Sequence, residues 1–129
     1  MLSYAAGRKQ GEEEGLAPDE LARKIVDAVS DKQAEDVLLL DIRNVASFAD
    51  YFVIASGQTG RQMRALIDAV DEVAEQDGVK PLGIEGEPDS GWVLIDYGDV
   101  IVHIFAPEER AYYDLEGFWH TATPVVRIQ

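Results

Sequence analysis

The most informative pattern of apolar and polar residues lies in residues 91–105. Two apolar runs flank the pair Gly98-Asp99, and a glycine at the first central position is typical of a two-residue type II′ hairpin turn. Such a turn fixes the register of two antiparallel strands, so that Trp92 lies opposite Phe105. The segment is therefore predicted to be a β-hairpin.

The register sorts the hairpin side chains onto two faces, because directly opposed residues share a face and successive residues alternate. One predicted face packs on a core: Val93, Ile95, Tyr97, Val100, Val102 and Ile104. The second, which we call the Trp92 face, mixes apolar anchors with an acid and a histidine: Trp92, Leu94, Asp96, Ile101, His103 and Phe105. This mixture favours a surface that is open in the isolated chain and is covered by a partner.

Apolar residues recur at helical spacing in three segments, which are predicted to be helices over residues 18–30, 59–78 and 107–119. Pro18 suits the first turn of the first helix, Thr59 can cap the second, and Gly78 can stop it. On the third helix, a stripe at positions i, i+3 and i+7 is expected to pack on the sheet: Tyr112, Leu115 and Trp119. Tyr113 and Glu116 share another face and are candidate interface residues.

Short apolar runs predict further strands over residues 36–42, 51–55 and 79–84. Pro81 places the last of these at a sheet edge, because proline cannot donate to a strand ladder. Residues 1–17 are expected to form a flexible extension, and residues 120–129 a mostly extended tail. The order αββαβββα predicts an α+β or α/β fold with a mixed sheet of about five strands and flanking helices. Three helices are few for both faces, so part of one face is expected to stay accessible.

The net charge narrows the choice of partner. Twenty-five acidic and eleven basic residues give −14, which opposes direct dependence on nucleic acid, since phosphate binding rests on lysine and arginine. The charge favours a basic partner, although it also serves general solubility. No apolar run approaches the roughly 20 residues of a membrane helix, and cysteine is absent. These features predict a globular cytoplasmic protein with no membrane partner.

Few residues are candidates for catalysis. The loop of residues 56–61 lies between a strand and a helix, where phosphate can bind, but it lacks the Walker and dinucleotide patterns and is better explained as a turn. Acids at 85, 87, 89, 96 and 99 are better explained as solvated turn residues than as a magnesium site. The two histidines lack zinc-ligand spacing, and His103 suits a partner contact or a satisfied strand position equally well. We therefore predict no catalytic residues, metal or cofactor.

Three stretches carry a family resemblance: GIEGE at 83–87, GWVLIDYGDVIVHIF at 91–105 and RAYYDLEGFW at 110–119. Together with DVLLLDIRNVASFADYFVIASGQTGRQMRAL upstream, they resemble the ribosomal silencing factor (Iojap-related) family over about residues 18–119. We expect this range to be one domain, preceded by the extension and followed by the tail.

The resemblance implies a fold similar to a nucleotidyltransferase core without the usual paired metal-binding aspartates. It implies a translational repressor that binds the fourteenth protein of the large ribosomal subunit and blocks subunit joining during starvation, with homodimers possible in the family. The alternative is a diverged nucleotide-binding or nucleotidyltransferase-like enzyme. The family motif and the hairpin faces together predict these partner-binding residues: Trp92, Leu94, Asp96, Ile101, His103, Phe105, Glu85, Glu87, Tyr113 and Glu116.

Overall fold

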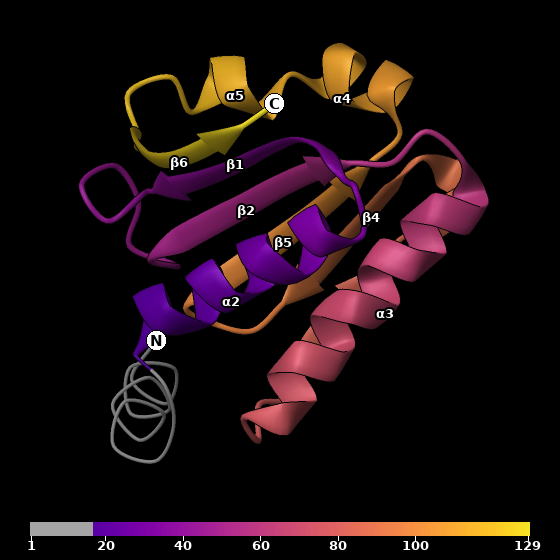
Figure 1. The fold of residues 1–129 in the computed structure, drawn as a ribbon. Helices are drawn as coiled ribbons and strands as arrows, with labels where there is room; N and C mark the ends of the chain where they lie inside the picture. The colour runs from indigo at the N-terminus through magenta and orange to yellow at the C-terminus, as the bar shows by residue number, and fades with distance from the viewer. Residues whose placement is uncertain (1–16) are drawn as a thin grey trace.

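The computed structural model describes residues 17–129, so the expected N-terminal extension lies almost wholly outside the described residues. The described chain forms a mixed sheet with two long helices on one face, and two short helices run along the sheet on the side away from them (Figure 1). The elements are α2 (Pro18–Asp31), β1 (Glu35–Asp41), β2 (Tyr51–Ser56), α3 (Gly60–Gln76), β3 (Gly83–Glu85), the 3-10 helix η1 (Pro88–Ser90), β4 (Trp92–Asp96), β5 (Val100–Phe105), α4 (Pro107–Tyr113), α5 (Leu115–Phe118) and β6 (Thr123–Ile128).

The sheet has six strands in the order β3-β4-β5-β2-β1-β6. Strands β2 and β5 run parallel, and every other neighbouring pair is antiparallel. The predicted mixed sheet and α+β class are therefore confirmed. The sixth strand comes from the expected tail, where β6 pairs with β1 and Val126 lies opposite Leu39.

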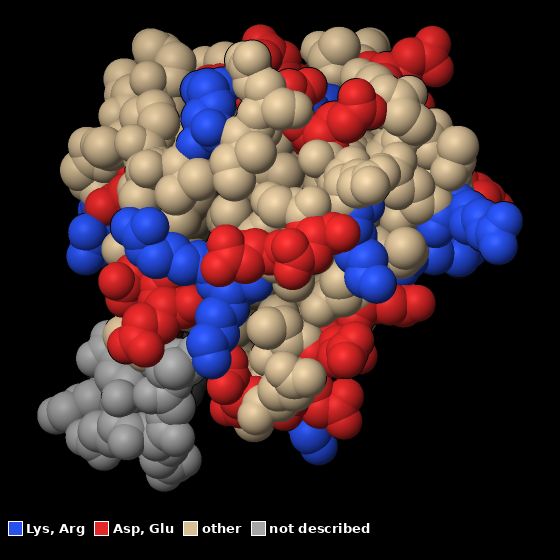
Figure 2. All heavy atoms as spheres, in the orientation of Figure 1, with Lys and Arg blue, Asp and Glu red and all other residues tan. Residues whose placement is uncertain are grey.

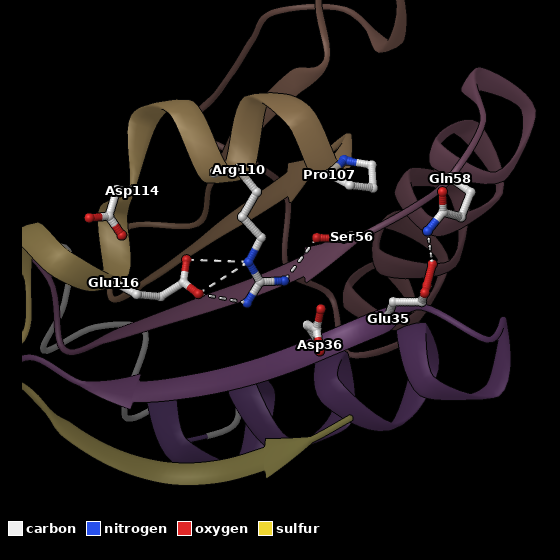
Figure 3. Close-up of a pocket in the computed structure, with 9 residues that line it drawn as sticks. Glu35, Asp36, Ser56, Gln58, Pro107, Arg110, Asp114 and Glu116 are labelled. Carbon is white, nitrogen blue, oxygen red and sulfur yellow. Dashed lines mark hydrogen bonds and ion pairs between the residues drawn. The ribbon is translucent and has the colours of Figure 1, made fainter.

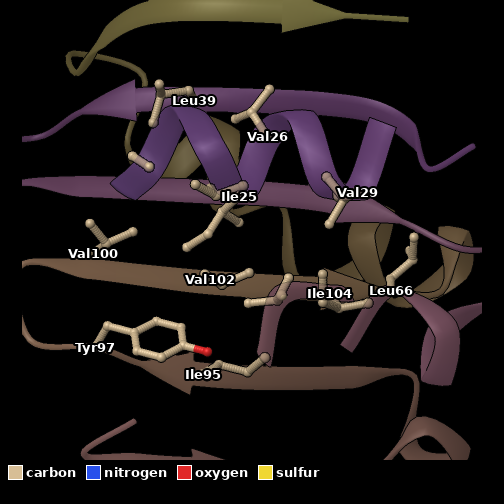
Figure 4. Close-up of a cluster of buried hydrophobic side chains, with 14 of the residues drawn as sticks. Ile25, Val26, Val29, Leu39, Leu66, Ile95, Tyr97, Val100, Val102 and Ile104 are labelled. Carbon is tan, nitrogen blue, oxygen red and sulfur yellow. The ribbon is translucent and has the colours of Figure 1, made fainter. Parts of the chain in front are cut away.

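Helices α2 and α3 pack on one face of the sheet and cover the main core (Figure 4). Ile25 and Val29 of α2 are fully buried against it, as is Leu66 of α3. The predicted cap of α3 is confirmed, since the Gln62 N–H donates to Thr59 Oγ1 at 3.0 Å. With both long helices on one face, the opposite face depends on loops and short helices for cover.

The hairpin of β4 and β5 has the predicted register, with Trp92 opposite Phe105 and Asp96 opposite Ile101. Gly98 has a φ of 88°, the positive value that the first turn position requires. All six residues of the predicted core face are buried. Turn chemistry and alternation therefore sufficed to fix this part of the fold.

The predicted last helix is wrong in one respect, because it is broken into α4 and α5. Asp114 between them adopts a φ of 48°, which ends α4, and its side chain accepts a hydrogen bond from the Gly117 N–H at 3.1 Å. Helical spacing does not continue across this break. Tyr112, expected in the core, is 82% exposed, whereas Leu115 and Trp119 are half-buried against the sheet.

The predicted strand over residues 79–84 is also shorter than expected. Only Gly83–Glu85 forms β3, which starts after Pro81 and lies at the sheet edge as predicted. Pro81 removes a backbone donor, so the residues before it do not join the ladder.

Candidate partner-binding surface

A continuous group of ring side chains crosses the sheet face that α2 and α3 leave free. We call it the aromatic row, and it consists of Phe48, Phe52, Trp92, His103, Phe105, Tyr112, Tyr113, Phe118 and Trp119. Neighbouring rings lie with centroids 4.5 to 6.2 Å apart, the range in which aromatic pairs attract one another. The row joins elements that are distant in sequence into one surface.

The two ends of the aromatic row are exposed and its centre is buried. Phe118 is 73% exposed at one end and Tyr112 is 82% exposed at the other. Phe48 and Tyr113 are also exposed, while Phe52, His103 and Phe105 lie beneath. Large apolar side chains that are exposed together, as at each end of the row, are typical of an interaction site.

Trp92 is the half-buried residue that links the buried centre to the exposed Tyr113 end. Its ring stacks on Phe105 at 5.0 Å and contacts Tyr113 at 4.5 Å. Trp92 also lines a mostly apolar hollow of about 170 Å³, the Trp92 hollow, together with Glu85, Gly86 and Leu94. An aromatic ring beside a hollow with an acid at its rim suits a basic side chain with an apolar stem.

The Trp92 face is less open than its sequence pattern suggested. Trp92, Leu94 and Asp96 are half-buried, whereas Ile101 and His103 are buried and Phe105 is completely so. Trp119 and Phe52 account for part of this cover, because both pack in the same cluster. On this face the β4 side chains are therefore accessible from solvent, and the β5 side chains lie beneath them.

The predicted acidic contacts have structural partners of their own. Asp96 accepts a hydrogen bond from the Gly98 N–H at 2.7 Å and so supports the hairpin turn. Glu87 is exposed and caps η1. Glu85 is exposed on β3 at the rim of the Trp92 hollow. Glu85 and Glu87 therefore offer exposed carboxylates in the segment that leads into Trp92.

Acidic residues dominate the segment that contains the hairpin, α4 and α5. Residues 81–119, which we call the acidic segment, contain nine aspartates or glutamates and a single basic residue, Arg110. Acidic side chains also gather along α3, where Figure 2 shows them on the opposite, helix-bearing face. Because the aromatic row lies largely within the acidic segment, a basic partner would be attracted to this side.

Arg110 is held in a pocket of about 290 Å³ beside α4 (Figure 3). Its guanidinium donates to Ser56 Oγ at 2.9 Å and pairs with the Glu116 carboxylate at 3.2 Å. Glu116, predicted as an interface residue, is thus engaged in tying α5 to α4. Through this pair, Arg110 fixes the helix that carries Tyr112 and Tyr113.

The loop of residues 56–61 borders the same pocket but offers little to a phosphate. The Gln58 N–H donates to Gln62 Oε1 at 2.8 Å, and Thr59 already caps α3. The pocket wall also carries four carboxylates: Glu35, Asp36, Asp114 and Glu116. Negative charge repels phosphate, so the observed pocket disfavours nucleotide binding.

His103 is 4% exposed, and burial lowers its pKa to about 4. Its Nδ1 accepts a hydrogen bond from the Trp92 Nε1–H at 3.2 Å. The imidazole is therefore neutral at physiological pH. The sequence suggested that His103 is either a partner contact or a satisfied strand residue, and neither interpretation included a bond to Trp92.

Sequence patterns missed several members of the aromatic row. Phe48 belongs to the connector between β1 and β2, and Phe118 to the short α5. Neither position lies in a periodic pattern, so only the tertiary fold places it beside Trp119. Phe52 lies in the strand predicted over residues 51–55, but the sequence does not show which face its side chain occupies, because strand pairing sets it.

Two features of residues 17–129 bear on other functions. None of the helices described there has the length and apolar character needed to cross a membrane. Within the same range, no group of three or more histidine, aspartate or glutamate side chains is arranged to hold a metal ion.

Comparisons with known proteins connect this geometry to a family. The family model described as ribosomal silencing factor during starvation matches residues 16–129. A ribosomal silencing factor of Halalkalibacterium halodurans is 40% identical over 114 residues, covering 88% of this chain and 97% of that protein. The chloroplastic Iojap protein of Zea mays is 34% identical over 81% of this chain and 45% of its own length. A crystal structure of a Chromobacterium violaceum protein has a TM-score of 0.78 at 33% identity, covering 81% of this chain and 88% of that one.

Proposed function

The chain belongs to the ribosomal silencing factor family, and on that premise we propose that it represses translation by binding the large ribosomal subunit. The proposed contact is the fourteenth protein of that subunit. Occupation of this site would obstruct joining of the small subunit. The proposed action is a steric block, with no catalytic step.

The aromatic row within the acidic segment is the observation that supports this proposal. Ribosomal proteins are usually basic, and nine acids against one arginine make this segment attractive to such a protein. Trp92 supplies an aromatic anchor beside a hollow, and Tyr113 extends it. Buried aromatic anchors surrounded by polar groups are typical of residues that dominate binding energy.

Co-sedimentation with isolated large ribosomal subunits tests the proposal. The intact chain should sediment with the subunits, and Trp92→Ala should reduce the bound fraction strongly. Leu82→Ala is the matched control, because Leu82 is 70% exposed but lies outside the aromatic row. Failure of the intact chain to sediment, or equal binding by both variants, would contradict the proposed surface.

A diverged nucleotide-binding enzyme is the alternative that the sequence left open. Two features disfavour it: the Gln58 N–H of the 56–61 loop already donates to Gln62, and four carboxylates line the Arg110 pocket. A calorimetric titration with a nucleoside triphosphate and Mg²⁺ separates the two functions. We expect no binding heat, whereas saturable heat together with turnover would support the enzyme.

A further inference from the structure

The Trp92–His103 contact joins the half-buried anchor of the aromatic row to a buried polar residue. His103 on β5 lies opposite Leu94, so Trp92 is its diagonal neighbour on the same face of the hairpin. The indole Nε1–H donates to His103 Nδ1 at 3.2 Å. Because Nδ1 accepts this bond, the proton of the neutral imidazole lies on Nε2.

The second imidazole nitrogen makes a histidine at position 103 costly for folding stability. His103 Nε2 is buried and has no hydrogen-bond partner among residues 17–129. A buried donor without a partner costs about 1–3 kcal/mol. The ring is surrounded by Phe52, Phe105 and Trp92, so an apolar ring would satisfy the packing without this cost. The acceptor that His103 offers to Trp92 explains why a histidine occupies the site.

We propose that His103 is a positioning residue that fixes the indole of Trp92 for partner binding. The Trp92 ring has Phe105 stacked on one side and Tyr113 against it, and these contacts set the plane of the ring. The bond to His103 Nδ1 adds a directional restraint, because it holds the N–H edge of the indole against β5. Trp92 also lines the Trp92 hollow, so a ring restrained in this way presents a fixed wall to a partner. The lowered pKa of His103 keeps Nδ1 unprotonated and able to accept.

The inference about the indole is tested without any partner, by nuclear magnetic resonance of the indole N–H groups. The chain has two tryptophans, and Trp119→Phe identifies the Trp92 signal. In the intact chain this signal should be protected from solvent exchange. His103→Phe removes the acceptor but keeps an aromatic ring, so the Trp92 signal should shift and exchange faster. His103→Asn keeps an acceptor near the position of Nδ1 and should restore protection.

The binding effect rests on the proposed function and is measured with isolated large ribosomal subunits. We expect His103→Phe to weaken binding about two- to tenfold, the value of one hydrogen bond, and His103→Asn to stay within about twofold of the intact chain on the same scale. In a Trp92→Phe background, which lacks the donor, His103→Phe should cause no further loss. That absence of a further loss distinguishes positioning through Trp92 from direct contact by His103.

Each outcome bears on a different claim. An unchanged Trp92 signal in a folded His103→Phe variant would overturn the positioning role, whether or not the chain binds ribosomes. A full further loss in the Trp92→Phe background would also overturn it. If the Trp92 signal behaves as expected but no variant binds large subunits, the positioning of Trp92 stands and the proposed function fails. Should His103→Phe not fold, Trp92 exchange in His103→Asn decides, and fast exchange there would overturn the inference.

Discussion

The rings of Trp92 and Tyr113 are in contact, with centroids 4.5 Å apart, although one belongs to β4 and the other to α4. The hairpin and the helix that follows it therefore present a single surface. Arg110 holds α4 in this place by its bonds to Ser56 and Glu116. The candidate surface thus depends on a partly buried ion pair behind it.

We expect Trp92→Ala to weaken large-subunit binding by more than about 1 kcal/mol, the usual threshold for an anchor residue. Because Tyr113 touches the same ring, Tyr113→Ala and the double variant should give a coupling energy of about 0.5–1.5 kcal/mol in a double-mutant cycle. Titrations of large subunits with labelled chain give the four binding constants of the cycle, for the intact chain, the two single variants and the double variant. Strictly additive losses would mean that the two rings act separately.

Local signals determined much of the fold. The Gly98 turn fixed the register of the hairpin, and the Thr59 cap fixed the start of α3. Both are short-range features, so a single sequence contains the needed information. No local pattern marks the helix break at Asp114. A non-glycine residue with positive φ is uncommon, and the apolar residues on both sides of Asp114 keep helical spacing in the sequence.

The candidate surface was only partly predictable. Trp92, Leu94 and Asp96 follow from alternation in the hairpin, and their partial exposure agrees with an accessible face. The burial of His103 and Phe105 depends on Phe52 and on residues after the Asp114 break, which meet them only in the folded chain. The boundaries of the domain and the likeness to a nucleotidyltransferase core stay predictions.

Gly86 should tolerate no side chain. Its φ is 86°, and an added Cβ would overlap the carbonyl oxygen of Trp92. Gly86→Ala is therefore expected to lower the free energy of unfolding by at least about 2 kcal/mol, measured by urea denaturation. Gly83→Ala is the control, because its Cβ would have open space in the adjacent strand β3. Equal stability of the two variants would contradict the close approach.

Folding stability should depend on His103 in acid. Burial lowers its folded pKa to about 4 from the ordinary 6.5, so the unfolded chain binds the proton first as pH falls. The contribution of neutral His103 to stability is therefore fully present above about pH 6.5. It is lost progressively as the pH falls from about 6.5 towards 4. Between pH 7.5 and pH 4.5 the loss should be roughly 2–3 kcal/mol.

His103→Phe isolates this contribution, because the carboxylates titrate in both chains. Urea denaturation of the intact chain and the variant at both pH values should show a difference that grows in favour of the variant in acid. A difference independent of pH would mean that the folded pKa of His103 is not lowered.

The acidic segment should speed association with its basic partner. We expect the association rate to fall as salt rises, while the dissociation rate changes less. The double variant Glu85→Gln with Glu87→Gln should associate several-fold more slowly at low salt. Glu72→Gln with Glu75→Gln changes the net charge equally on α3 and should have a smaller effect. Stopped-flow rates that are equal for both pairs would show that charge acts without regard to position.

Inhibition of subunit joining should be stoichiometric. A chain that obstructs one site must occupy that site on each large subunit, so inhibition should saturate near one chain per subunit. Light scattering of subunit mixtures, with increasing amounts of the chain, measures this ratio directly.

Asp96→Asn keeps the oxygen that accepts the Gly98 N–H, so it should reduce inhibition only a few-fold, as a lost charge near the surface would. A catalytic carboxylate would instead be required for any activity. If a small fraction of chain inactivates many subunits, or if Asp96→Asn abolishes the effect in a folded protein, obstruction is the wrong mechanism and an enzymatic one must replace it.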